Sequence, residues 1–173
     1  SHCVLYDKKG TINMLSDEYS LCYAEMNDID SWIKMVHIVK DKFPGLETAE
    51  KMEGYRQIVI KNIKRKTALC VRYNGDVVGA IMFSYNSKCL SFMAVHPDHR
   101  RKGIASAMIE KMLSLFPNNT YITVTTYRAN DIKGIAPRAL YKKYGFEEDE
   151  LVTEFDYPLQ KLVLNKKFYK GLK

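Results

Sequence analysis

Apolar and polar residues alternate with two different periods along the chain, and the switches between these periods outline the predicted elements. Strand-like runs cover residues 19–24, 68–73, 77–85, 88–95 and 121–126, and the alternation after residue 147 predicts two more strands. Helical spacing of apolar residues marks segments at about 27–43, 47–64, 103–116 and 137–145. The predicted order is β-αα-βββ-α-β-α-ββ, an α+β fold with a mixed, mostly antiparallel central sheet and helices on both faces.

Turn residues indicate how the middle strands connect. Asn74-Gly75-Asp76 separates two strand-like runs and is the strongest hairpin signal in the sequence. A second turn at Asn86-Ser87 extends this pair into an antiparallel meander. The strand at 88–95, the helix that follows it and the strand at 121–126 then form a right-handed β-α-β crossover.

Residues 88–116 join a strand to a helix through a basic turn. The strand ends in a His-Pro-Asp turn, three cations precede Gly103, and helical periodicity begins there. The first turn of a helix leaves backbone N–H groups without intrahelical partners and carries the positive end of the macrodipole. Because a glycine lets a ligand approach the backbone, the pattern predicts a phosphate site, although a solvated basic turn would use the same residues.

Composition fits one enzyme-sized domain. The chain has 173 residues, 46% of them hydrophobic, and a formal net charge of +7 that suits an anionic partner. Coenzyme A, nucleic acid and a membrane surface all satisfy that charge, but the basic cluster at 61–66 lacks the interleaved aromatic residues typical of nucleic-acid binding. No apolar run has the length of a membrane span. The four cysteines form no C-x-x-C pair, which argues against zinc and favours free thiols in a reducing, cytoplasmic setting: Cys3, Cys22, Cys70 and Cys89.

Two motifs in the right order resemble the GNAT superfamily of acetyl-CoA-dependent N-acetyltransferases. The first follows a strand that ends in Ala-Val-His-Pro and reads Arg100-Arg101-Lys102-Gly103-Ile104-Ala105, similar to the family's Arg/Gln-x-x-Gly-x-Gly/Ala. The second, Leu140-Tyr141-Lys142-Lys143-Tyr144-Gly145-Phe146, is similar to its Leu-Tyr-x-x-x-Gly-Phe segment. With the surrounding elements the resemblance covers roughly residues 19–165. It implies one GNAT-like domain at 14–173, while residues 1–13 are expected to be an extension or a tag remnant.

The resemblance implies acetyl-CoA as co-substrate, no metal, and specific residues for binding and catalysis. Two neighbouring strands splay apart in the family, and the pantetheine arm enters between them. The implied cofactor-binding residues are Met93, Ala94, Val95, Arg100, Arg101, Lys102, Gly103, Ile104, Ala105 and Ser106. Tyr141 is the implied general acid, since a phenol is protonated at neutral pH and can give its proton to the leaving thiolate. The chain departs from the family pattern at Gly134, where Asn is frequent, and at Pro137, where Ala is frequent.

The general base and the acceptor are less defined. The strand before the basic turn carries no acid, so Ser91 could orient a water, while His37, His96 and His99 are expected to be structural or solvated. Acidic residues at 47–53 and 147–150 would suit a cationic amine, although a solvated surface without a binding role would show the same pattern of acidic residues. The predicted function is acetyl transfer to a primary amine of a small molecule or peptide by direct attack in a ternary complex. A non-catalytic acyl-CoA sensor is the alternative, and a homodimer is compatible with either.

Overall fold

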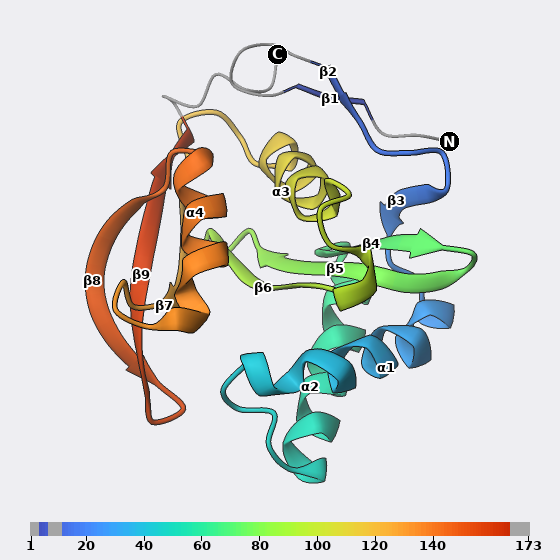
Figure 1. The fold of residues 1–173 in the computed structure, drawn as a ribbon, viewed down its shortest axis with the longest axis horizontal. Helices are drawn as coiled ribbons and strands as arrows, with labels where there is room; N and C mark the ends of the chain where they lie inside the picture. Colours follow the sequence, from blue (N-terminus) through green and yellow to red (C-terminus); the bar gives the residue numbers. More distant parts are fainter. Residues whose placement is uncertain (1–3, 7–11, 167–173) are drawn as a thin grey trace.

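The computed structural model describes residues 4–6 and 12–166, and it contains a seven-stranded mixed sheet covered by helices on both faces (Figure 1). The strand order in this sheet is β3-β4-β5-β6-β7-β9-β8, and all neighbours are antiparallel except β6 and β7. The strands are β3 (Tyr19–Tyr23), β4 (Ala68–Tyr73), β5 (Asp76–Ser84), β6 (Cys89–Val95), β7 (Tyr121–Tyr127), β8 (Glu147–Glu154) and β9 (Tyr157–Asn165). A separate antiparallel pair is formed by β1 (Val4–Tyr6) and β2 (Ile12–Met14).

The helices and the strands of the main sheet follow one another in the predicted order, β-αα-βββ-α-β-α-ββ. The α-helices are α1 (Ile29–Val39), α2 (Ala49–Arg65), α3 (Ile104–Leu115) and α4 (Ile135–Lys143). Short 3-10 turns precede or follow them: η1 (Met26–Asp28), η2 (Lys40–Lys42), η3 (Pro97–His99) and η4 (Ile132–Gly134). The prediction of a mixed, mostly antiparallel α+β fold is confirmed. Residues 1–3 and 7–11 of the expected N-terminal extension lie outside the described residues.

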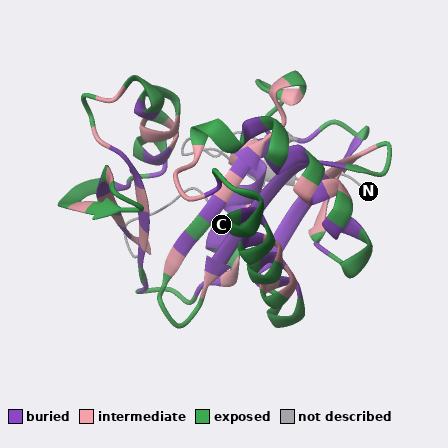
Figure 2. Ribbon diagram, turned by 90° about the horizontal axis from the view of Figure 1, so that it is seen from below, coloured by how far each residue is buried: buried purple, intermediate pink, exposed green. Residues whose placement is uncertain are grey.

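The core has two halves, one on each face of the sheet. Along β5, Ile81 and Phe83 belong to the cluster under α3, whereas Ala80 and Met82 belong to the cluster under α1 and α2. Successive side chains of a strand point to opposite faces, so helices on both faces require a strand that is apolar throughout. Figure 2 shows the central strands as the buried part of the molecule and the outer helix faces as exposed.

The parallel pair β6–β7 is short, and the two strands diverge beyond it. They pair only at Cys89↔Thr123 and Leu90↔Val124, whereas β6 follows β5 up to Val95 and β7 follows β9 along its whole length. The register of β6 against β5 shifts at Ser91, so a β-bulge marks the position where the divergence starts. The divergence opens a wedge in the middle of the sheet.

The first helix ends earlier than its apolar pattern predicts. That pattern extends to residue 43, but α1 ends at Val39, and Phe43 has an extended backbone with φ −128° and ψ 120°. The residue before a proline is disfavoured in helical conformation, and Pro44 follows directly. Phe43 therefore lies outside the helix and packs on Phe92, with 4.8 Å between the ring centroids.

A buried ion pair fixes the start of α1 to the sheet. The Asp28 carboxylate accepts hydrogen bonds from the Nε and Nη2 of Arg72 at 2.8 and 2.7 Å, and from the Glu25 N–H at 2.7 Å. Burial opposes the charge of Asp28, but these hydrogen bonds outweigh it, so the pKa of the carboxyl lies below its ordinary value. Asp28 and Arg72 are 44 residues apart, so nothing in the sequence indicates this contact with β4.

Three cysteines of the described part are free thiols, and two of them face each other. Cys22 and Cys70 are directly opposite on β3 and β4, and their sulfur atoms are 3.8 Å apart. Cys3 lies outside the described residues. Within residues 4–6 and 12–166 no cluster of three metal-binding side chains occurs, and no helix has the length and apolarity to cross a membrane.

Candidate active site

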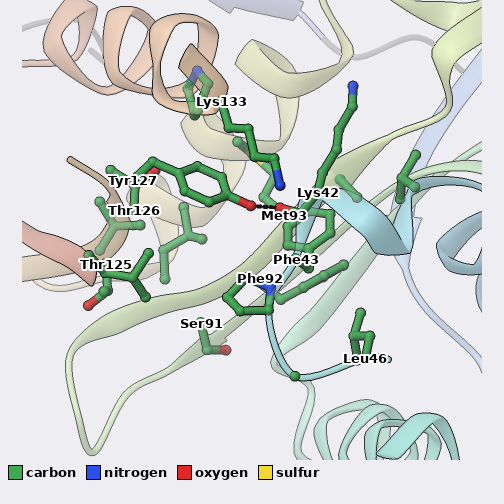
Figure 3. Close-up of a pocket in the computed structure, with 18 of the residues that line it drawn as sticks. Lys42, Phe43, Leu46, Ser91, Phe92, Met93, Thr125, Thr126, Tyr127 and Lys133 are labelled. Atoms are coloured by element: carbon green, nitrogen blue, oxygen red, sulfur yellow. Dashed lines mark hydrogen bonds between the residues drawn. The ribbon is translucent and has the colours of Figure 1, made fainter. Parts of the chain in front are cut away.

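The wedge between β6 and β7 opens into a cavity of about 1090 Å³ (Figure 3). Residues 90–95 of β6 and 124–127 of β7 form its walls. One end is bounded by Arg100 and Leu140, on the side of α3 and α4, and we call this the cofactor half. The other end is bounded by α2, residues 42–46 and the β8–β9 hairpin, and we call it the acceptor half.

In the cofactor half, the basic turn presents the free N-terminus of α3. Gly103 precedes the helix with φ 80° and ψ 10°, in the left-handed region that favours glycine, and a Cβ built on it would meet no atom within 4 Å. The Ala107 N–H donates to the Gly103 carbonyl at 2.9 Å, so the N–H groups of residues 104–106 precede the first intrahelical bond. These donors, the helix dipole and the exposed cations at 100–102 form a candidate anion site.

The edge of β6 offers backbone groups to the same half. The His96 N–H donates to the Val78 carbonyl at 2.8 Å, and the register pairs Ala94 with Ala80. Because successive residues of a strand point their backbone groups to opposite edges, the N–H and C=O of Ala94 face β5, and those of Met93 and Val95 face the wedge. Of the three implied backbone contacts, two are therefore available, and Ala94 is excluded as a backbone partner.

Tyr141 lies where the two halves meet. Its side chain lines the cavity while only 5% of the residue is exposed, and its ring packs edge-on against Phe146 at 5.6 Å. Burial raises the pKa of the phenol, and the hydroxyl makes no hydrogen bond to any described residue. The phenol is therefore protonated at neutral pH and is free to donate to a ligand in the cavity.

The acceptor half is assembled from segments far apart in the chain. The Tyr127 hydroxyl donates to the Lys42 carbonyl, which ties the end of β7 to the turn after α1 (Figure 3). The ring of Phe155, at the tip of the β8–β9 hairpin, lies against Gly45. Tyr55 of α2 also lines the cavity, and its hydroxyl accepts a hydrogen bond from the Trp32 indole N–H at 2.9 Å.

Comparison with known proteins identifies the fold and the domain. Residues 64–148 match the profile of the acetyltransferase (GNAT) domain. The resemblance to the GNAT family is confirmed. A GNAT acetyltransferase from Bacillus cereus ATCC 10987 superposes with a TM-score of 0.64 at 22% identity, covering 86% of this chain and 97% of that one. The yncA protein of Salmonella typhimurium, solved with its cofactor acetyl-CoA, has a TM-score of 0.64 at 14% identity, covering 91% and 99%.

One curated relative is much longer than this chain. The cysteine-rich protein 2-binding protein of Mus musculus is 26% identical over 155 residues, which is 88% of this chain but 18% of the relative. The chain thus spans less than a fifth of the length of that protein.

Two departures from the GNAT motif have a local cause. At Gly134 a Cβ would meet the Cβ of Tyr127 at 3.0 Å and the Arg128 carbonyl oxygen at 3.1 Å, so the Asn that is frequent there would require these neighbours to shift. Pro137 is the third residue of α4, in the first turn, where its missing N–H breaks no helical bond. The entry to α4 is altered, but Tyr141 still lines the cavity.

The histidines lie outside the cavity lining. The Nδ1 of His96 accepts a hydrogen bond from the Asp98 N–H at 3.1 Å, and His99 Nδ1 lies 2.9 Å from the Tyr19 hydroxyl. Both rings therefore support the turn before the anion site. His37 is exposed on α1. The expectation that the histidines are structural or solvated agrees with these positions.

The acidic runs do not reach the cavity, which corrects the idea that they receive the amine. Glu47 pairs with Lys51 at 3.1 Å, Glu148 with Arg138 at 2.5 Å, and Glu150 with Lys161 at 2.8 Å. Among the described residues that line the cavity, the single carboxylate is Glu154. The lining cations of the acceptor half are Lys42, Lys51 and Lys133, none of which was predicted as a site residue.

Proposed function

We propose that this chain is an acetyl-CoA-dependent N-acetyltransferase, which transfers an acetyl group to a primary amine of a small molecule or peptide within a ternary complex. The observation that carries the proposal is the divergence of β6 and β7 beyond Leu90. It leaves an edge of β6 facing one large cavity, which Arg100 borders at the side of the basic turn and the acceptor half bounds at the other side. The GNAT domain match and the acetyl-CoA bound to yncA support the choice of co-substrate.

The cofactor half supplies complementary groups along its length. The pyrophosphate would accept hydrogen bonds from the N–H groups at 104–106, with Arg100, Arg101 and Lys102 adding positive charge. Gly103 leaves the approach open. The backbone groups of Met93 and Val95 would pair with the amides of the pantetheine arm, in the way that a strand extends a sheet edge.

The chemistry requires two proton movements. The amine nitrogen attacks the thioester carbonyl carbon, a C–N bond forms, and the C–S bond breaks. The amine would lose one proton to a water molecule oriented by the hydroxyl of Ser91, which lines the cavity. The leaving thiolate takes the Tyr141 proton, and solvent restores it to the phenol afterwards. Holding both substrates in one cavity adds the advantage of proximity.

A thiol-release assay with acetyl-CoA over a panel of primary amines tests the proposal, together with calorimetry of acetyl-CoA binding. We expect acetyl-CoA to bind and thiol release to depend on the amine. If acetyl-CoA binds but no amine accelerates thiol release, the chain is a non-catalytic acyl-CoA sensor instead. If acetyl-CoA does not bind, the assignment of the cofactor half is wrong.

A further inference from the structure

The charged side chains of the acceptor half are unevenly compensated. Lys51 is neutralised by Glu47, whose carboxylate lies 3.1 Å from its ammonium. Lys42 and Lys133 make no ion pair with a described residue, and the cavity presents one carboxylate, Glu154, against them. Among the described side chains that line the acceptor half, the cations therefore outnumber the carboxylates, which favours a negatively charged ligand.

The ammonium of Lys133 forms no ion pair with Asp131, although the two charges interact. Asp131 lies two residues before it, but its oxygens accept from the Lys133 N–H at 2.9 Å and from the Tyr157 hydroxyl at 2.5 Å. The Lys133 Nζ instead makes a long contact of 3.4 Å with the Asp41 carbonyl and lies 5.9 Å from the centre of the Tyr157 ring. Figure 3 shows it beside the contact between Tyr127 and Lys42. This ammonium can donate to a ligand without giving up an ion pair.

The mouth of the same half is apolar as well as basic. Four large apolar side chains line the cavity while staying mostly in water, with exposed fractions of 51%, 81%, 67% and 68%: Ile58, Ile132, Ile135 and Phe155. Single exposed apolar residues are ordinary, but a group around one opening marks a surface that an apolar ligand covers. The acceptor must then present apolar surface in addition to charge.

We propose that the acceptor amine belongs to a small amphipathic molecule with an anionic group, such as an amino acid that has an apolar side chain. This inference rests on the proposed function and names its substrate class. The amine lies toward Tyr141 and the thioester, the apolar body covers the four residues at the mouth, and the anionic group receives hydrogen bonds from Lys133. The anion is a carboxylate or a phosphonate-like group, because a lysine ammonium binds either as a point charge.

Matched amines test the inference. L-Leucine and L-phenylalanine each have an uncharged amide and a decarboxylated amine, and the aminophosphonate analogue of phenylalanine separates phosphonate from carboxylate binding. The kcat/KM from thiol release is compared for each compound between the parent chain and Lys133→Gln. An amino acid and its amide have different fractions of unprotonated amine at the same pH, so their kcat/KM values cannot be compared directly. The deciding quantity is therefore the change that Lys133→Gln causes in the ratio of kcat/KM for the acid to kcat/KM for the amide.

We expect Lys133→Gln to lower kcat/KM about tenfold for the anionic compounds and less than twofold for their amides and amines. Glycine, which lacks the apolar body, should be a poor acceptor with the parent. Lys34→Gln is the matched control, because Lys34 is exposed on α1 and does not line the cavity. An unchanged acid-to-amide ratio in Lys133→Gln overturns the inference while leaving the acetyltransferase proposal intact. Absence of thiol release with every amine overturns the proposed function first.

Discussion

The cofactor half and the acceptor half of the cavity are built in different ways. The cofactor half comes mainly from one continuous run, in which β6, the basic turn and the start of α3 follow one another between residues 89 and 106. The acceptor half brings together the turn after α1, the middle of α2, the end of β7, η4 and the tip of the β8–β9 hairpin. Its tying contacts join residues 85 and 92 positions apart in the chain.

This difference determines what each half can recognise. The donors of the cofactor half are largely backbone groups, fixed by strand register and by the left-handed turn at Gly103, so they suit one constant ligand. The acceptor half uses side chains on turns and a hairpin tip, where substitutions change shape and charge at little cost to the sheet. A constant co-substrate and a variable acceptor fit this division.

The largest expected effect comes from a substitution at Gly103, which precedes the backbone N–H groups of the cofactor half. Gly103→Asp places a carboxylate where the pyrophosphate would lie, and we expect calorimetry to detect no acetyl-CoA binding. Gly103→Asn is the matched control, since it has the same size without the charge and Asn tolerates the left-handed conformation. Parental affinity in a folded Gly103→Asp chain would show that the phosphate site lies elsewhere.

The next effect concerns the residue between the halves. Tyr141→Phe keeps the ring and removes the proton, so we expect acetyl-CoA affinity to stay near parental while kcat falls about 10²- to 10⁴-fold. Burial raises the pKa of this phenol, so the parent rate should show no loss of the acid form at alkaline pH up to about 9. The measurement is kcat with the best amine, beside a melting curve. A kcat within a few-fold of the parent would remove Tyr141 from the mechanism.

The same contrast explains which features could be predicted from the sequence. The Asn74-Gly75 turn has φ of 50° and 84°, the conformation that its dipeptide favours, and β4 runs from Ala68 to Tyr73 as its apolar pattern indicates. The basic turn and the start of α3 at Gly103 could likewise be predicted, because all the residues of the candidate anion site are close together in the sequence. Signals of this kind depend on local backbone preference, so they can be recognised without knowledge of the fold.

The acceptor half had no such signal. Tyr127 lies one residue beyond the predicted strand, and nothing in its neighbours indicates a hydrogen bond to the Lys42 carbonyl. Lys133 looks like any solvated cation, and only the fold places it beside Asp41. Residues 147–150 formed a conspicuous acidic run, yet the structure pairs two of its carboxylates with Arg138 and Lys161. Contacts between distant segments depend on topology, which residue patterns constrain only weakly.

A third prediction tests the scaffold of the acceptor half. Asp28→Asn leaves Arg72 with only its longer ion pair to the exposed Glu25, at 3.7 Å, and we expect the free energy of unfolding at pH 7 to fall by roughly 2 to 3 kcal/mol. Asp30→Asn is the matched control: its partner Arg56 is 3.0 Å away, but the Asp30 side chain is 91% exposed, so the loss should stay below about 1 kcal/mol.

The pH dependence of this pair has a definite sign. The pKa of Asp28 is lowered in the folded chain, so its contribution is fully present above the ordinary value of 3.8 and is lost as the pH falls through the folded value. Denaturant unfolding of parent and Asp28→Asn should therefore differ most near neutral pH and converge only under acid. A constant difference from pH 7 to acid would mean that the carboxylate charge contributes nothing.

A smaller effect distinguishes side-chain charge from backbone donors in the cofactor half. Arg100 lines the cavity and makes no ion pair with a described residue, so Arg100→Ala should weaken acetyl-CoA binding by about 1 to 3 kcal/mol. The loss should shrink as salt rises, because added ions screen an exposed charge. Calorimetric titrations at low and high salt measure it. A loss that is independent of salt would indicate a packing role.

The smallest expected effect tests whether a residue outside the continuous segment 89–106 also contributes to acetyl-CoA binding. The Lys143 Nζ of α4 lies 3.5 Å from the Ser106 hydroxyl, so a second helix adds positive charge beside the first turn of α3. Its exposure limits the gain, and we expect Lys143→Ala to weaken acetyl-CoA binding by about 0.3 to 1 kcal/mol, or two- to fivefold. Lys142→Ala is the matched control, since it removes the same charge one position away on an exposed face. Equal losses in the two variants would mean that only net charge matters, whereas a loss confined to Lys143→Ala would extend the anion site to α4, the helix that also carries Tyr141.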